Sequence, residues 1–157
     1  MSIAQAVSEH RVLVVCNVPG AGDRLRRTLE ARARDGHVEA VVVAPALNSR
    51  LRHWTSDEDG ARAAAADRLR RCMGRLEDTG GAAVRGEVGD ADPEQAIADT
   101  LATFAADEIV IATEPPARSH RLARDLVERA ADRFSLPVTP VEVDEPRPPA
   151  PLGAARR

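Results

Sequence analysis

Three arginines surround the predicted start of a helix in the segment "TEPPARSHRLARD". An apolar run stops at Thr113, and a helical pattern begins near Ser119. Cations at a helix N-terminus oppose the helix dipole, whereas an anion there is stabilised by free amide groups and by guanidinium forks. The pattern therefore indicates a site for a small anion or a nucleotide phosphate. Its predicted contacts are Thr113, Arg118, Ser119, Arg121 and Arg124.

Two adjacent prolines restrict what this loop can do. Pro115 and Pro116 carry no N–H group, so they cannot supply the row of backbone donors that a glycine-rich phosphate loop offers. In the alternative interpretation, Glu114, Asp125 and Glu128 neutralise the arginines in surface pairs. The residues alone leave both interpretations open.

A second candidate contact is the segment "NVPGAGD", which follows the first apolar run. Gly20 and Gly22 permit a tight turn and a close backbone approach to a ligand, and Asn17 precedes them. The dinucleotide pattern GxGxxG is incomplete because its third glycine position is Leu25, and no Walker motif is present. A plain turn is the alternative interpretation.

A third candidate is the segment "RLRHW". Arg50, Arg52, His53 and Trp54 could form a cationic lid with one stacking surface. Alternatively, Trp54 packs on the body of the protein or on a partner subunit, since tryptophan is common at interfaces. The second interpretation makes this loop a docking element for a protein partner.

Length and charge limit the class of protein. The chain of 157 residues fits one domain, and 43% hydrophobic with 30% charged residues is typical of a soluble globular protein. A net charge of −3 gives no general attraction to nucleic acid or to an anionic membrane. No apolar stretch reaches the length of a membrane span, and the N-terminus lacks the regions of a signal peptide. We expect a cytoplasmic protein with no nucleic-acid or membrane partner.

The sequence lacks the usual signatures of catalysis and metal binding. It has no GxSxG nucleophile motif, and neither HxxxH nor HExxH is present. Cys16 and Cys72 lie in apolar and helical surroundings without a CxxC pattern, so we expect two buried, reduced thiols rather than a disulfide or a metal pair. We therefore predict no catalytic residue, no metal and no enzyme activity.

Short β-branched runs alternate with longer helical patterns along the chain. Runs such as 11–18, 38–45 and 107–113 are typical of strands covered on both faces. Before the third helix, Asp92 is the predicted N-cap, Pro93 the first helical residue and Gln95 the closing residue of a capping box. The order βαβαβαβαβ predicts an α/β fold with a mostly parallel sheet and helices on both faces. We expect one domain over residues 1–144 and a proline-rich, disordered tail over 145–157.

This layout resembles the universal stress protein family. The resemblance is carried by "VLVV" in the first strand, "GEVGDADPEQAI" after the third, "ADEIVIAT" as the fourth and "LPVTPVEV" as the fifth. It covers about residues 10 to 144. It implies a five-stranded parallel sheet of order 3-2-1-4-5. It also implies homodimers through the last strand, with Val138, Val141 and Val143 at the contact.

ATP-binding members of that family carry the pattern G-x-x-G-x9-G-[ST] after the fourth strand. Here the corresponding positions are Ala112 or Thr113, Pro115 or Pro116, Arg124 and Asp125, so no glycine is present. The family's adenine-contacting aspartate corresponds to Asn17. The combined prediction is a non-enzymatic, dimeric regulatory module without a resident cofactor. ATP and AMP are the nucleotides that the resemblance suggests for its anion site, and a protein-interaction scaffold without a ligand is the alternative.

Overall fold

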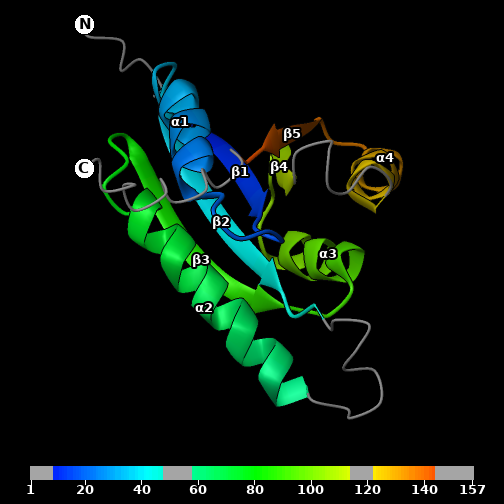
Figure 1. The fold of residues 1–157 in the computed structure, drawn as a ribbon. Coiled ribbons are helices and arrows are strands. Elements are labelled where there is room, and N and C mark those ends of the chain that lie inside the picture. The colour runs from blue at the N-terminus through cyan, green and yellow to red at the C-terminus, as the bar shows by residue number, and fades with distance from the viewer. Residues whose placement is uncertain (1–8, 48–57, 114–121, 144–157) are drawn as a thin grey trace, which may run out of the picture.

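One parallel β-sheet organises the molecule. The computed structural model describes residues 9–47, 58–113 and 122–143. Its five strands lie in the order β3-β2-β1-β4-β5, and each neighbouring pair is parallel (Figure 1). The elements are β1 Glu9–Val15, α1 Gly22–Ala33, β2 His37–Pro45, α2 Glu58–Leu76, β3 Ala82–Gly89, α3 Pro93–Thr103, β4 Glu108–Thr113, α4 Leu122–Phe134 and β5 Val138–Glu142. The predicted fold class and strand order are confirmed.

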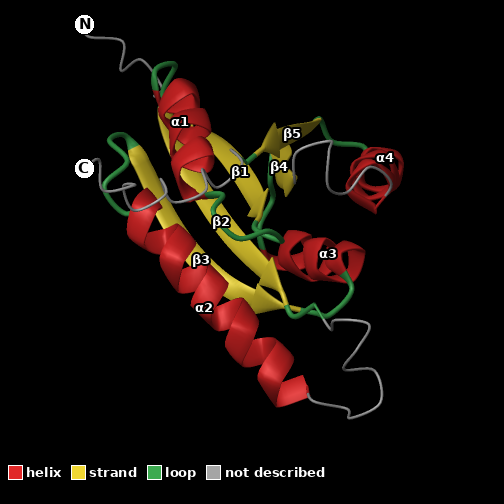
Figure 2. Ribbon diagram, viewed as in Figure 1, coloured by secondary structure: helices red, strands yellow, loops and turns green. Residues whose placement is uncertain are grey.

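Helices cover both faces of the sheet, as Figure 2 shows. In β1, Val12 and Val14 pack in the core under α1 and α2, whereas Leu13 and Val15 pack in the core with α3 and α4. A strand that is buried on both sides needs apolar residues at every position, since its side chains alternate between the faces. This explains the continuous apolar run in the sequence.

The start of α3 corrects one prediction. Asp92 is the N-cap, and its Oδ1 accepts a hydrogen bond from the Glu94 amide at 3.0 Å. The predicted capping box is absent, because the Gln95 side chain donates to Asp99 instead. The Asp92 amide is satisfied by Asp90 Oδ1 at 2.9 Å. The two hydrogen bonds at this helix start are therefore accepted by two aspartates, whereas the sequence pattern predicted an aspartate and a glutamine.

A charged network joins the amino ends of β1 and β4 to α1. Arg32 Nε donates to Glu108 Oε1 at 2.6 Å, and its Nη2 lies 3.3 Å from Oε2. His10 Nε2 is 3.0 Å from Oε1, and Thr139 Oγ1 donates to Oε2 at 3.5 Å. Burial alone raises the pKa of Glu108, but the hydrogen bonds and charges of Arg32 and His10 outweigh it and hold this pKa below its ordinary value.

Two further predictions, the start of the fourth helix and the C-terminal tail, fall wholly or partly outside the described residues. In the described residues, α4 begins at Leu122, three residues after the predicted start at Ser119, which lies outside them. The predicted tail over 145–157 also lies outside the described residues. Within the described ranges, none of the helices has the length and apolar character that crossing a bilayer requires.

Candidate functional site

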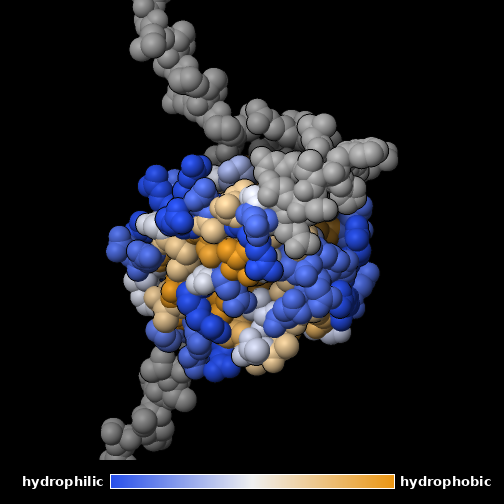
Figure 3. Space-filling model, turned by 90° about the horizontal axis from the view of Figure 1, so that it is seen from below, coloured by the Kyte–Doolittle hydropathy of each residue, from blue (hydrophilic) through white to orange (hydrophobic). Residues whose placement is uncertain are grey.

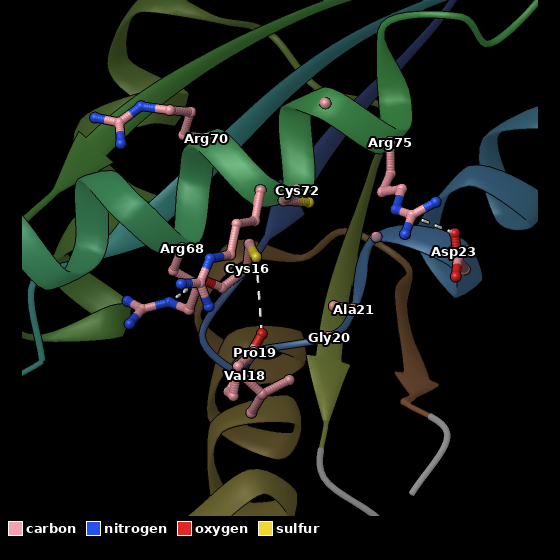
Figure 4. Close-up of a pocket in the computed structure, with 13 residues that line it drawn as sticks. Cys16, Val18, Pro19, Gly20, Ala21, Asp23, Arg68, Arg70, Cys72 and Arg75 are labelled. Carbon is pink, nitrogen blue, oxygen red and sulfur yellow. Dashed lines mark hydrogen bonds and ion pairs between the residues drawn. The ribbon is translucent and has the colours of Figure 1, made fainter. Parts of the chain in front are cut away.

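A pocket of about 540 Å³ lies at the carboxyl end of β1, between the loop that follows this strand and one face of α2 (Figure 4). The loop side contributes Cys16, Gly20 and Gly22. The helix side contributes the row of basic residues that includes Arg68 and Arg75. Ligands of parallel α/β sheets commonly bind at the carboxyl ends of the strands, so this is the expected edge for a site.

Arg68 fastens α2 to the sheet at this edge. Its Nε donates to the carbonyl of Cys16 at 3.1 Å, and its Nη2 donates to the carbonyl of Pro45 at 2.6 Å. Cys16 directly follows β1, and Pro45 is the last residue of the adjacent strand β2. One guanidinium group therefore satisfies both strand ends and adds a fixed positive charge to the wall of the pocket.

The other arginines of the helix differ in their partners. Arg75 Nε lies 3.8 Å from Asp23 Oδ1, and both side chains are about two-thirds exposed, so the pair is weak. Arg70, which also lines the pocket, pairs with Asp67 at 2.8 Å (Figure 4). Arg71 is exposed, and within the described residues it has neither an ion pair nor a hydrogen bond. Among the arginines that line this pocket, Arg71 is therefore the one whose guanidinium group has no partner in the described part of the chain.

The start of α1 faces the same space without a side-chain cap. The N-cap residue is Ala21, whose methyl group cannot accept a hydrogen bond from the first turn. Gly20, just before it, has φ of +79°, a conformation that favours glycine. The first-turn amides and the positive end of the helix dipole therefore lack a side-chain partner at the N-cap.

Gly22 has a packing role that the sequence did not reveal. A Cβ at this position would lie 2.8 Å from Cβ and Cγ of Arg75 and 3.7 Å from Cα of Cys72. The residue is buried where α1 and α2 approach each other. Glycine at this position allows the two helices to close the side of the pocket.

Two cysteines form the floor of the pocket next to Arg68. Cys16 and Cys72 are both buried, and Figure 4 shows their sulfur atoms on the same side of α2. The Cys16 thiol donates a weak hydrogen bond to the Val18 carbonyl at 3.9 Å. The neighbouring Cys72 side chain lowers the pKa of Cys16 against the opposing effect of burial, and the charge of Arg68 lowers it further. The neighbouring Cys16 side chain, together with burial, raises the pKa of Cys72. Both cysteines are buried and free, as predicted, and they belong to the same core cluster.

Asn17 lies between the pocket floor and the glycine turn. Its Oδ1 atom is buried and has no hydrogen-bond partner in the described structure. A buried amide oxygen without a partner costs about 1–3 kcal/mol. This polar group at the end of β1 therefore has spare capacity to accept a hydrogen bond.

The structure brings together only part of the predicted site. Gly20 and Gly22 line the pocket, with Asn17 in the same loop. Thr113 ends β4, the strand next to β1. Arg118, Ser119 and Arg121, the side chain of Arg124, and the segment around Trp54 lie outside the described residues.

Sequence reasoning missed the basic face of α2. Arg68, Arg71 and Arg75 are spaced three and four apart, so they share one helical face with Cys72. That spacing was a usable signal, because a face that carries both arginines and a buried cysteine differs from a solvated surface. The sequence alone did not show that this face meets the loop after β1, since the two segments are far apart in the chain.

The surroundings of this edge are apolar at the centre. Figure 3 views the molecule from the side on which β2 and β3 end in Figure 1, with orange surface in the middle and blue hydrophilic side chains around it. Among the described residues, no group of three or more metal-ligating side chains is present.

Comparisons with known proteins agree on the fold. The chain belongs to the class of doubly wound, parallel α/β proteins, and solved structures of universal stress proteins match its fold. One from Lactobacillus plantarum has a TM-score of 0.58 at 17% identity and covers 86% of this chain and 97% of its own. One from Archaeoglobus fulgidus has a TM-score of 0.51 at 24% identity, with coverage of 86% and 99%.

A third match is a universal stress protein in complex with cAMP, with a TM-score of 0.52, 15% identity and coverage of 86% and 98%. No protein-family model and no curated protein matches the sequence. The chain therefore has the universal stress protein fold, as its resemblance implied. The low identities establish the fold and not the ligand.

Proposed function

We propose that this protein is a non-enzymatic regulatory module of the universal stress protein type that binds a small phosphate-bearing anion. The observation that carries the proposal is the pocket at the end of β1, where Arg71 has no partner among the described residues and lies beside the uncapped start of α1. Amide groups at the start of a helix and guanidinium groups are the donors that commonly bind phosphate.

The charge balance of the pocket supports an anion. Arg68, Arg71 and Arg75 line it together with Arg70, against one acidic lining residue, Asp23. Arg68 is held by strand carbonyls, which do not neutralise its charge. A phosphate placed here would be attracted by several cations without displacing a strong ion pair, because the pair between Arg75 and Asp23 is exposed and weak.

The ligand class follows from the size and surroundings of the site. A volume of about 540 Å³ lies within the range of small-molecule pockets. The apolar surface at this edge suits a ligand with an aromatic or apolar part beside its phosphate. Nucleoside phosphates combine both features, and one structural relative is described in complex with cAMP. The predicted anion contacts Arg118, Ser119, Arg121 and Arg124 remain part of this proposal as a second group of donors after β4.

The test is isothermal titration with AMP, ATP, cAMP and inorganic phosphate, comparing wild type with Arg71→Ala. Loss of a charge-assisted hydrogen bond of about 1.5–3 kcal/mol predicts binding that is weaker by roughly tenfold or more. Arg62→Ala is the matched control, because Arg62 is an exposed arginine of the same helix that does not line the pocket.

Three results would count against the proposal. Absence of binding by wild type to all four compounds would remove the ligand role and favour the scaffold interpretation. Equal affinity of Arg71→Ala and wild type for the anion would show that the binding site does not include this face of α2. Release of phosphate from ATP in a turnover assay would contradict the non-enzymatic assignment.

We also propose a homodimer through β5, which is the outer strand of the sheet. The Val143 amide donates to Thr113 and the Pro137 carbonyl accepts from Ile109, so odd-numbered residues of β5 direct their backbone groups to β4. Pro140 therefore faces the free edge without an N–H group, which limits backbone pairing there. The half-buried side chains of Val138 and Val141 would supply part of the contact, whereas the predicted contact residue Val143 is buried in the core of the chain itself. Light scattering of wild type against Val141→Asp tests it, with a monomeric wild type as the contrary result.

A further inference from the structure

The outer strand β3 has a sequence that is symmetric about its central glycine. Residues 84–88 are Val-Arg-Gly-Glu-Val, so one charge of each sign flanks Gly86 and a valine follows on either side. β3 ends the sheet on the side away from β5, as Figure 2 shows. Gly86 has only backbone atoms and is exposed, so the backbone at the centre of this strand is accessible.

The backbone of β3 directs alternate residues to the free edge. The Val38 amide donates to the Gly81 carbonyl, so odd-numbered residues of β3 direct their backbone groups to β2. The even-numbered residues therefore direct their N–H and C=O groups outward. In the symmetric stretch these are Val84, Gly86 and Val88. None of them is proline, whereas Pro140 faces the free edge of β5 without an N–H group.

The two charged residues of this stretch lie on the face of the sheet away from α2, because a Cβ at Gly86 would point to α2 and neighbouring side chains alternate. Arg85 is exposed, and its guanidinium carbon lies 5.8 Å from the centre of the Phe104 ring. Glu87 accepts a hydrogen bond from Thr100 at 2.7 Å through one of its oxygens. Within the described residues, neither charged side chain has an ion pair. Both are therefore available to opposite charges on another molecule.

We propose that a second copy of this chain binds at this edge, with the two β3 strands antiparallel and the two-fold axis at Gly86. Val84 then faces Val88 of the partner subunit, and the outward backbone groups of the two strands pair with each other. Arg85 faces Glu87 of the partner subunit at a position without backbone hydrogen bonds, where facing side chains lie closest. The axis creates this ion pair twice. A register shifted by two residues would instead place like charges opposite each other.

The helix on the other face fits this arrangement. α2 packs on both β2 and β3. Because neighbouring strands are about 4.8 Å apart, the axes of the two α2 helices would be separated by about 10 Å, which is a usual distance for packed helices. Leu69 and Met73 lie closest to the Cβ position of Gly86 and are only partly buried. The second copy of α2 would cover them.

This contact goes beyond the proposed function, because it involves neither the anion pocket nor β5. The edges formed by β3 and β5 are at opposite ends of the sheet, so one assembly can contain both contacts. A contact at β3 extends the sheet from five strands to ten. Variants at one edge therefore test that edge without altering the other.

The test measures the mass and the dissociation constant of the full-length protein by light scattering and by sedimentation over a series of concentrations. Arg85→Glu turns both ion pairs into like-charge pairs, so the dissociation constant should rise by at least about tenfold. The mass should fall to that of the monomer, or to that of the β5 dimer if that contact also forms. The double variant Arg85→Glu/Glu87→Arg exchanges the two charges and should restore the assembly.

The matched control is Arg11→Glu. The guanidinium carbon of Arg11 lies 5.9 Å from the centre of the same Phe104 ring, but Arg11 belongs to β1, inside the sheet. This variant makes the same change of charge and loses the same kind of ring contact, and it should leave the mass unchanged. A fall in mass equal to that of Arg85→Glu would assign the effect to the ring contact and overturn the proposal.

Cysteine cross-linking tests the register separately. In the double variant Arg85→Cys/Glu87→Cys, mild oxidation should link position 85 to position 87 of the other copy, because facing residues without backbone hydrogen bonds are close enough for a disulfide. Neither single variant should cross-link in this way. A monomeric wild type, a mass that falls in Val141→Asp but not in Arg85→Glu, or the absence of this cross-link would overturn the proposal.

Discussion

The two ends of the central strand β1 differ in how their charges are used. At the amino end, Glu108 is surrounded by Arg32, His10 and Thr139, and each of its oxygens accepts hydrogen bonds. At the carboxyl end, Arg71 has no partner among the described residues and the Asn17 oxygen is unpaired. One end uses its polar groups to hold the fold, and the other leaves them available.

This difference follows from the direction of a parallel sheet. All its crossover helices begin at the carboxyl ends of the strands, where their positive dipole ends gather. Arginines of α2 at that edge add charge of the same sign, which an internal carboxylate or an external anion must offset. At the amino end, a buried carboxylate has already offset Arg32. Mutations at the two ends should therefore affect different properties.

The largest stability effect is expected at the amino end. Glu108→Ala leaves Arg32 and His10 without their shared partner, and breaking a largely buried ion pair costs about 3 kcal/mol. Urea unfolding monitored by circular dichroism measures this loss. Asp67→Ala is the control, because its pair with Arg70 is exposed and should contribute less than about 1 kcal/mol. If both variants lost the same unfolding free energy, the charged network at the amino end would not stabilise the fold more than an exposed ion pair does.

A smaller loss is expected from Gly22→Ala at the carboxyl end. The added methyl group would lie 2.8 Å from Arg75 side-chain atoms, so overpacking should cost about 1–3 kcal/mol. Gly74→Ala, in α2 itself, meets nothing within 4 Å and should raise stability by about 0.5–1 kcal/mol. Thermal unfolding of both variants tests the close approach of α1 and α2. A neutral Gly22→Ala would show that this approach is looser than the structure indicates.

Acid should remove part of the contribution of Glu108. Its pKa in the folded protein lies below the ordinary value of 4.5, so the unfolded chain binds this proton first as the pH falls. The stabilisation is therefore complete above pH 4.5 and declines as the pH drops toward the folded-state pKa. Unfolding free energies of wild type should fall more steeply over this range than those of Glu108→Gln. Parallel curves would mean that other carboxylates control the acid response.

The smallest stability effect is expected for Arg71→Ala. An exposed side chain without a partner in the described part of the chain should change the unfolding free energy by less than about 0.5 kcal/mol. The same variant should lose anion binding, which would separate binding from folding at this end of β1. A loss of more than about 1 kcal/mol would assign Arg71 to the fold and weaken the contrast between the two ends.

Much of the architecture was predictable because burial on both faces leaves a direct trace in the sequence. The run around Val12–Val15 contains no polar residue, which only a central strand of a parallel sheet requires. The site was less predictable. The segment chosen for its arginines, around Arg118 and Arg121, lies outside the described residues, whereas the arginines that line the observed pocket belong to a segment that the pattern predicted only as a helix.

Local patterns in the sequence were enough to establish the order of elements, the parallel sheet and the helices on its two faces, because hydrophobic periodicity is a local property. They also indicated that Gly20 and Gly22 shape the loop after β1. Two further features emerged from the folded chain: Arg68 joins the ends of β1 and β2, and Gly22 allows the close packing of α1 and α2. These contacts join residues far apart in the chain. They depend on how α1 and α2 pack on one face of the sheet, which local sequence patterns do not show.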